Sequence, residues 1–393
     1  MKIYIRKNAT ETLGKTNEIK DERLSNFICG YFLFSALNLA VKMIWGNFAA
    51  WAYISKGVLA VLLLFALTSV YSRKMVLFVF SEFAVAMLFG ITFLRGMQNE
   101  QFYSIVFNAL VVYLPMGLCV FSLNSVDILL KKLYRFSFLT NALLLFVALS
   151  FQTTGLEYSM SVGYALLFQS LILFDHFFEK RKVLDILLVI IDFIAICLYG
   201  SRGPILCIAV YTIIKIIISG DVPIRKRIAI TFSAVFLILI FPTVLANLIS
   251  RMPSVFDTSR TLSFLRTGTL VSNDSGRREI FALYIEQIKQ RPWVGYGLAG
   301  GWQYSSYPHN IVIELMLSFG IPMGLILFVY IAFVEIRSLL HGSKADRSLS
   351  SILFVTLIEL FVSGSFMMST HFFMMLAMGI RSKRCALQEQ HGG

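Results

Sequence analysis

Charged residues are scarce in this chain. Asp, Glu, Lys and Arg make up 15% of its 393 residues, whereas hydrophobic residues reach 57%. A soluble domain carries about 25% charged residues, so the composition excludes an ordinary soluble globular protein. It predicts an all-α integral membrane protein, with a single polytopic membrane domain over residues 1–393 in a lipid bilayer. The sequence shows no internal repeat, low-complexity segment or second soluble domain.

Several residue patterns that would hold a metal or a disulfide are also missing. The five cysteines form no CxxC pair, and none lies in the large loop described below, so neither a disulfide nor a zinc site is predicted. The chain contains no Asp-x-Asp sequence, a pair with which many sugar-nucleotide glycosyltransferases hold a divalent metal. Its histidines lack metal-ligand spacing. We therefore expect neither a metal nor a cofactor.

Long apolar runs dominate the rest of the sequence. Residues 1–23 have mixed charge, and the run from Leu24 is long enough to span a bilayer, so no cleavable signal peptide is expected. A span needs about 20 mostly apolar residues. Twelve spans are predicted, near 24–45, 50–71, 75–95, 102–123, 136–152, 160–178, 183–199, 204–219, 228–248, 320–340, 349–365 and 366–380.

Basic residues decide the orientation of these spans. Short cytoplasmic loops carry an excess of Lys and Arg, and most of the chain's 35 basic residues fall on one face, which also holds both termini. The net charge of +13 follows from this bias and does not indicate nucleic-acid binding. The residues on this face are Lys2, Arg6, Lys7, Lys15, Lys20, Arg23, Arg73, Lys74, Lys131, Lys132, Arg135, Lys180, Arg181, Lys182, Arg225, Lys226, Arg227, Arg337, Lys344, Arg347, Arg381, Lys383 and Arg384.

One large loop, residues 249–308 between spans 9 and 10, is the exception. It faces outward but is basic, so it calls for an anionic partner. Together with the surface helix that follows, we expect residues 249–319 to form an extracytoplasmic catalytic loop. Its basic residues are Arg251, Arg260, Arg266, Arg277, Arg278, Lys289 and Arg291, against Asp257, Asp274, Glu279 and Glu286.

The spacing of apolar residues predicts an amphipathic helix over residues 277–290 of this loop, with Ile280, Tyr284 and Ile288 on one face. Arg277 and Arg278 then lie in its first turn, where the helix dipole disfavours cations. A bound anion, held by the arginine and by free backbone N–H groups, would explain this placement. The alternative is a solvated basic turn.

A second helix is predicted over residues 310–319, directly after His309. A histidine at a helix N-terminus has its pKa lowered, because the dipole opposes the imidazolium form. A neutral imidazole is suited to act as a general base. The alternative is a histidine that only caps the helix.

Two further patterns have open or negative interpretations. The glycines at 295, 297 and 300 match GxGxxG, but no strand precedes them, so they predict tight turns and not a nucleotide site. Lys56, Glu82, Asp192 and Glu359 lie deep in predicted spans, where a partner is expected. Pairing between helices and contact with a substrate both remain possible for them.

Five short motifs occur in order between residues 201 and 333. Their order around one outward loop resembles the O-antigen ligase and O-antigen polymerase superfamily of bacterial envelope enzymes. The motifs are Ser201-Arg202-Gly203, Gly276-Arg277, Pro292-x-x-Gly295-x-Gly297, His309-Asn310-x-x-x-Glu314 and Gly320-Ile321-Pro322-Met323-Gly324.

This resemblance implies a C-type glycosyltransferase fold and a polyprenyl-diphosphate-linked oligosaccharide as donor. His309 would be the catalytic base, and Arg277 and Arg202 would stabilise the departing diphosphate in place of a metal. Substrate contacts are expected from the remaining residues on this face. These are Arg278, Arg95 and Glu314, although no local motif secures Arg95.

Within the superfamily, we favour a polymerase, which joins repeat units of O-antigen, capsular or exopolysaccharide at the outer face of the bacterial cytoplasmic membrane. The main alternative is a ligase that transfers the glycan to lipid A-core or another acceptor. A transporter or flippase for lipid-linked sugars is a third possibility, but it would have repeated halves and a site at mid-membrane. Expected partners are the lipid-linked glycan, a flippase and a chain-length regulator, with no nucleic acid.

Overall fold

A computed structural model describes residues 2–46, 49–70, 72–98, 101–154, 160–199, 202–218, 225, 276–302 and 307–391. These residues form helices and connecting turns, and no β-strand occurs among them. The elements are α1 (Lys2–Trp45), α2 (Ala49–Leu67), α3 (Ser72–Leu94), α4 (Phe102–Asn108), the π-helix η1 (Ala109–Tyr113), α5 (Leu114–Ser122), α6 (Val126–Thr154), α7 (Met160–Lys180), α8 (Val183–Tyr199), α9 (Arg202–Ile218), α12 (Arg277–Gln290), α13 (Ile311–Phe319), α14 (Ile321–His341), α15 (Lys344–Val362), the 3-10 helix η3 (Phe366–Met368) and α16 (Thr370–His391).

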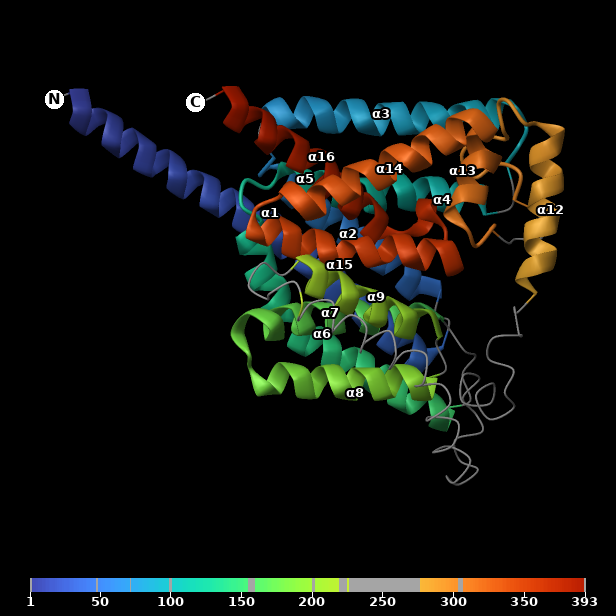
Figure 1. The fold of residues 1–393 in the computed structure, drawn as a ribbon, viewed down its shortest axis with the longest axis horizontal. Coiled ribbons are helices and arrows are strands. Elements are labelled where there is room, and N and C mark those ends of the chain that lie inside the picture. Colours follow the sequence, from blue (N-terminus) through green and yellow to red (C-terminus); the bar gives the residue numbers. More distant parts are fainter. Residues whose placement is uncertain are drawn as a thin grey trace.

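The long helices run side by side along one axis of the molecule, whereas α12 stands crosswise at one end (Figure 1). Both chain termini lie at the opposite end. We call these two ends the α12 end and the terminal end. Within the bundle, α1 packs along α6, α7 along α8, and α16 against α5 and α14.

Local sequence explains where individual helices begin. Pro322 lies in the first turn of α14, where the missing backbone N–H leaves no hydrogen bond unmade. Ser343 caps α15, since its hydroxyl accepts a hydrogen bond from the Asp346 backbone N–H at 3.1 Å.

The outer faces of the bundle are apolar. Large side chains on α2, α3 and α14 stand exposed, among them Phe65, Phe80 and Phe333. Within the described ranges, six helices are long and apolar enough to cross a membrane, and two shorter apolar helices accompany them. A surface of this kind needs lipid around it. The chain is therefore a multi-pass membrane protein.

The predicted spans agree with these helices in most places. The span predicted at 228–248 lies outside the described residues, as do residues 249–275 of the large loop. The last two predicted spans, 349–365 and 366–380, have different limits. The helix α15 begins earlier and ends at Val362, and a non-helical segment with the short helix η3 separates it from α16. Non-helical backbone is tolerated inside a membrane protein where it lines a cavity. This segment lines the cavity that is described below.

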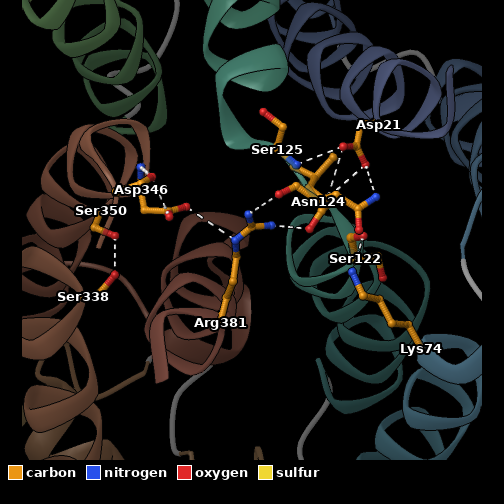
Figure 2. A network of polar contacts seen from close by, with 11 residues as sticks. Asp21, Lys74, Ser122, Asn124, Ser125, Ser338, Asp346, Ser350 and Arg381 are labelled. Atoms are coloured by element: carbon orange, nitrogen blue, oxygen red, sulfur yellow. Dashed lines mark hydrogen bonds and ion pairs between the residues drawn. The ribbon is translucent and has the colours of Figure 1, made fainter. Parts of the chain in front are cut away.

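The terminal end is held together by a network around Arg381 (Figure 2). Its guanidinium donates to the backbone carbonyls of Leu123 and of Asn124, the latter at 2.7 Å. It also pairs with Asp346 at 3.4 Å. Asp21 accepts hydrogen bonds from the Asn124 backbone N–H at 3.0 Å and from its side-chain amide at 3.2 Å. The network therefore joins α1, α15 and α16 to the turn between α5 and α6.

Candidate functional site

The predicted loop helix is confirmed, because α12 covers residues 277–290 as the spacing indicated. It buries Tyr284 and Ile288 against the bundle. Gly276 precedes it with a φ of 77°, a left-handed conformation that glycine adopts readily. No side chain caps the helix. Arg277 is therefore the first helical residue, next to backbone N–H groups that the helix leaves without intrahelical acceptors.

The loop after α12 is fixed to α13 by backbone hydrogen bonds. The N–H groups of Tyr296 and Gly297 donate to the carbonyls of Leu317 and Ser318, at 2.8 and 2.9 Å. Gly297 has a φ of 87°, and a Cβ there would come within 2.2 Å of the Thr92 hydroxyl. The sequence prediction that these glycines allow tight turns is confirmed. These bonds set the position of α12 relative to α13.

The second helix, α13, is capped by Asn310 and not by His309. The Asn310 side chain accepts hydrogen bonds from the N–H groups of Val312 and Ile313, at 3.0 and 3.2 Å. His309 lies one residue earlier with a φ of 55°. A non-glycine residue in this region is strained, and such strain is frequent at functional sites. The alternative in which His309 only caps the helix is therefore wrong.

The surroundings of His309 are those of a neutral imidazole. Its Nδ1 atom is buried and has no hydrogen-bond partner among the described residues. The Tyr307 ring lies 4.2 Å from the imidazole, centroid to centroid. Burial, and then the positive charge of Arg277, lower the pKa of His309 below its usual value. The lowered pKa agrees with the sequence prediction. Its causes are burial and Arg277, whereas the sequence analysis expected the helix dipole to lower it.

A segment that the sequence analysis did not identify contacts the residues around His309. It is the connection between α15 and α16, residues 363–369. Ser363 is hydrogen-bonded to the Tyr164 hydroxyl, and the backbone of Gly364 is hydrogen-bonded to the Tyr307 hydroxyl. Arg277 lies within electrostatic range of both tyrosines. The run Ser-Gly-Ser inside an apolar stretch was the signal that could have revealed it.

Glu314 anchors the same segment from α13. Its carboxyl group is fully buried and accepts hydrogen bonds from the Ser365 hydroxyl and from the Phe366 backbone N–H, the latter at 3.2 Å. Burial raises its pKa to about 8. We expected a substrate contact from the sequence, but these oxygens have protein partners. Glu314 therefore acts on the site through the position of residues 363–368.

A cavity of about 390 Å³ opens beside Tyr307. Helices α1, α6, α7, α15 and α16 surround it, together with η1 and the connection between α15 and α16. Glu359 is one of its lining residues. The cavity thus lies within the bundle and reaches Tyr307, whose ring contacts His309.

The other two predicted substrate contacts, Arg278 and Arg95, lie at exposed positions. Arg278 is exposed on the first turn of α12. Arg95 is exposed just after α3, three residues beyond the Thr92 side chain on which the Gly297 turn packs. In the described part of the chain, neither side chain contacts His309. Their roles stay predictions.

The side chain of Arg202 lies outside what the structure describes. Its backbone begins α9, and the next residue is closely approached by a site residue. A Cβ on Gly203 would meet the Tyr164 hydroxyl at 2.0 Å. The start of α9 therefore borders the site, as the motif order predicted, while the diphosphate contact of Arg202 remains a prediction.

The deep ionisable residues now divide into two groups. Asp192 accepts a hydrogen bond from Ser170 at 2.7 Å, and the Lys56 ammonium lies over the Phe107 ring at 5.4 Å. Both therefore have partners within the bundle. Glu82 and Glu359 differ, because no described residue donates a hydrogen bond to either carboxyl group, whereas only the Oδ1 atom of Asp192 is without a partner.

Across the described ranges, no three His, Cys, Asp or Glu side chains are grouped so that they could hold a metal ion. The expected independence from metals stays a prediction.

Comparison with known families supplies the remaining finding. Residues 187–329, from α8 to the middle of α14, match the family model described as O-antigen ligase. No curated protein matches the chain. The matched stretch contains Arg202, Arg277, His309 and Glu314. The resemblance drawn from the motifs is confirmed, since residues 187–329 match the O-antigen ligase family model, which supports the O-antigen ligase and polymerase superfamily.

Proposed function

We propose that this protein is a glycosyltransferase that polymerises polyprenyl-diphosphate-linked oligosaccharide repeat units. One observation carries the proposal: the buried Nδ1 atom of His309 has no partner among the described residues, and the imidazole lies within the electrostatic reach of Arg277 and against Tyr307, which lines a polar cavity. The family match supports a reaction that joins glycans. Positioned bases and cations beside a water-poor site are the requirements of glycosyl transfer from a diphosphate.

The reaction uses the two groups in different roles. An acceptor hydroxyl oxygen attacks the anomeric carbon of the donor while its proton passes to the neutral imidazole of His309. The bond between the anomeric carbon and the diphosphate oxygen breaks, and its electrons leave with the diphosphate. Arg277 stabilises that charge with a planar guanidinium, which can donate two parallel hydrogen bonds. Arg202 is proposed to assist at the start of α9.

The arrangement of the bundle supports an extracytoplasmic site in a cytoplasmic membrane of twelve spans. The termini lie at one end and α12 at the other (Figure 1), and positively charged loops favour a cytoplasmic terminal end. Cysteines at Glu286 and Lys344, both exposed, test this. An impermeant thiol reagent should label the Glu286→Cys variant alone in intact cells, and the opposite pattern would reverse the orientation.

Ligase activity is the second candidate, because the matching family model is described as O-antigen ligase. A ligase would move a finished chain from the same carrier to another acceptor, with the same base and arginine. A polymerase extends the chain on the carrier. Under either function, we propose a flippase as the supplier of the lipid-linked donor and a chain-length regulator as a partner of the polymerase.

The glycans of a strain carrying His309→Ala separate these functions. We expect the protein to remain in the membrane and single repeat units to replace long chains on gels. Activity should fall by about 10²–10⁴-fold, the usual contribution of a general base. Long chains that stay on the carrier lipid would instead identify a ligase. His341→Ala, at an exposed position at the end of α14, is the matched control, and unchanged glycans in the His309 variant would exclude the proposed mechanism.

A further inference from the structure

The cavity next to Tyr307 has a lining that is unusual for the interior of a membrane bundle. Hydroxyl-bearing residues from five helices and two connecting segments line one space of about 390 Å³. A buried water needs only ~10–15 Å³ of such space, so the cavity is far larger than a structural water site. The hydroxyl-bearing lining residues are Tyr31, Ser35, Tyr113, Thr140, Ser161, Tyr164, Tyr307, Ser363, Ser365, Ser369 and Thr370.

This lining excludes two parts of the donor. A polyprenyl chain is apolar, and against it the Glu359 carboxyl group and the Nε2 atom of His371, to which no described residue is hydrogen-bonded, would stay unbonded. A diphosphate needs cationic donors, and no lysine or arginine is among the described residues that line the cavity. Arg277 lies within electrostatic range of Tyr164 and Tyr307, two of the residues that line the cavity. The diphosphate therefore belongs outside the cavity, and an uncharged polar group belongs inside it.

Two side chains within the cavity retain unused hydrogen-bonding capacity. Glu359 faces it, and no described residue donates a hydrogen bond to its carboxyl group. The Nε2 atom of His371 is buried without a partner. Its ring is stacked on Phe32 with an interplanar angle of 11° and lies 4.4 Å from the Phe168 ring, centroid to centroid. Aromatic rings next to free donors and acceptors provide both faces of a sugar with a partner.

We propose that this cavity binds a sugar residue of the glycan next to the reacting bond, with Glu359 and His371 as its hydrogen-bonding partners. The inference rests on the proposed function, because it takes the diphosphate at Arg277 and the base at His309 as the edge of the site. It assigns substrate contacts to residues of α15 and α16, outside the stretch that matches the family model. The sugar belongs either to the donor or to the acceptor, and the experiment distinguishes them.

The test uses the full-length protein in lipid nanodiscs and three probes. These are the lipid-linked glycan that accumulates in a strain lacking this protein, the same glycan released from its carrier, and sugar-free polyprenyl diphosphate. The variants are Glu359→Leu and Ser35→Phe, the second of which fills the cavity. Replacing a half-buried carboxyl group without a hydrogen-bond donor by leucine removes an unfavourable desolvation, so Glu359→Leu should fold. Glu335→Leu is the control, since Glu335 is buried without a hydrogen bond but does not line the cavity.

Both cavity variants should bind glycan at least tenfold more weakly than the wild type, while binding sugar-free polyprenyl diphosphate within twofold. Glu335→Leu should match the wild type for all probes. A loss confined to the lipid-linked glycan places the donor sugar in the cavity, and a loss for the released glycan places the acceptor there. Wild-type glycan binding in both variants would overturn the inference, as would an equal loss for the sugar-free carrier. Glycan binding that depends on the cavity, in a wild-type protein that transfers no glycan, would refute the proposed function alone.

Discussion

The two ends of the bundle use polar groups in opposite ways. At the terminal end most charged groups are paired: Arg381 contacts two carbonyls and Asp346, and Lys215 and Asp175 form an ion pair. Glu335 is an exception, and Arg347 Nε and the Ser25 hydroxyl are also buried without hydrogen-bond partners in the described structure. Toward the α12 end, the Nδ1 atom of His309, the Nε2 atom of His371 and the indole N–H of Trp302 are buried without partners among the described residues.

This difference separates stability from function. A buried polar group that is bonded within the protein holds helices in place, whereas an unbonded one carries an unfavourable free energy that a ligand can relieve. The α12 end is therefore prepared for a substrate that brings donors, acceptors and negative charge. The terminal end needs no such substrate, because most of its charged groups are paired within the protein. Substitutions at the two ends should consequently change different measurements.

After His309→Ala, the largest effect is expected from Arg277→Lys. The charge is kept, but an ammonium cannot reproduce the two parallel hydrogen bonds of a guanidinium to diphosphate oxygens. We expect glycan transfer to fall by about 100-fold, the size typical of losing one transition-state donor, with an unchanged melting temperature. Arg278→Lys, one residue further on and exposed, is the control and should stay within about threefold. Equal losses at both positions would show that the helix start acts through bulk charge.

A smaller but distinctive effect concerns pH. The pKa of His309 is lowered by burial and by Arg277, so its neutral form already predominates at neutral pH. The rate at limiting substrate should be flat above the usual histidine value of about 6.5. Below the lowered pKa it should fall by about tenfold per pH unit, because the imidazolium cannot accept a proton. In Arg277→Gln, loss of the positive charge should move this fall to higher pH. A profile that shifts in the opposite direction would contradict the assignment of His309 as base.

Much of the α12 end could be predicted from sequence, for local reasons. The limits of α12 follow from apolar spacing and from Pro292, and the start of α13 follows from Asn310. The backbone conformation of His309 could not be predicted, because a positive φ is uncommon for a residue other than glycine. The segment 363–369 was read as parts of two spans, since its Ser and Gly residues are few among apolar neighbours.

The side-chain partners between helices also could not be predicted from the sequence. Glu314 lies in a motif next to His309, which favoured a substrate contact, but its partners are 51 and 52 residues away in the chain. Likewise, Arg381 is bonded to carbonyls more than 250 residues away, at separations of 258 and 257. Hydropathy and charge identify which residues lie near a membrane face, but not which of them meet.

Glu314 holds residues 363–368 beside the site, so its substitution should have a moderate effect on activity. In Glu314→Ala, the Ser365 hydroxyl and the Phe366 N–H lose their acceptor, so residues 363–368 should shift and transfer should fall by several-fold to tenfold. Since burial raises the pKa of Glu314 to about 8, the group is mostly protonated at neutral pH, and neutral Glu314→Gln should retain most activity. Its melting temperature should also exceed that of the wild type increasingly as pH rises from about 4.5 to 8, because ionisation then favours the unfolded wild type. A glutamine variant as inactive as the alanine variant would indicate a direct catalytic role.

The smallest effect on activity, and the clearest on stability, is expected from Arg381→Ala at the terminal end. The substitution leaves two carbonyls and the largely buried Asp346 without their partner, which should cost about 1–3 kcal/mol for each group left unsatisfied. The melting temperature in detergent should drop, while transfer per folded molecule should stay within about twofold, because no part of the network borders the cavity. Lys344→Ala removes an ion pair whose lysine side chain is 78% exposed and should change neither quantity measurably. If Arg381→Ala abolished transfer in protein that is still folded, the two ends would be coupled, and the separation of stability from function along this bundle would be wrong.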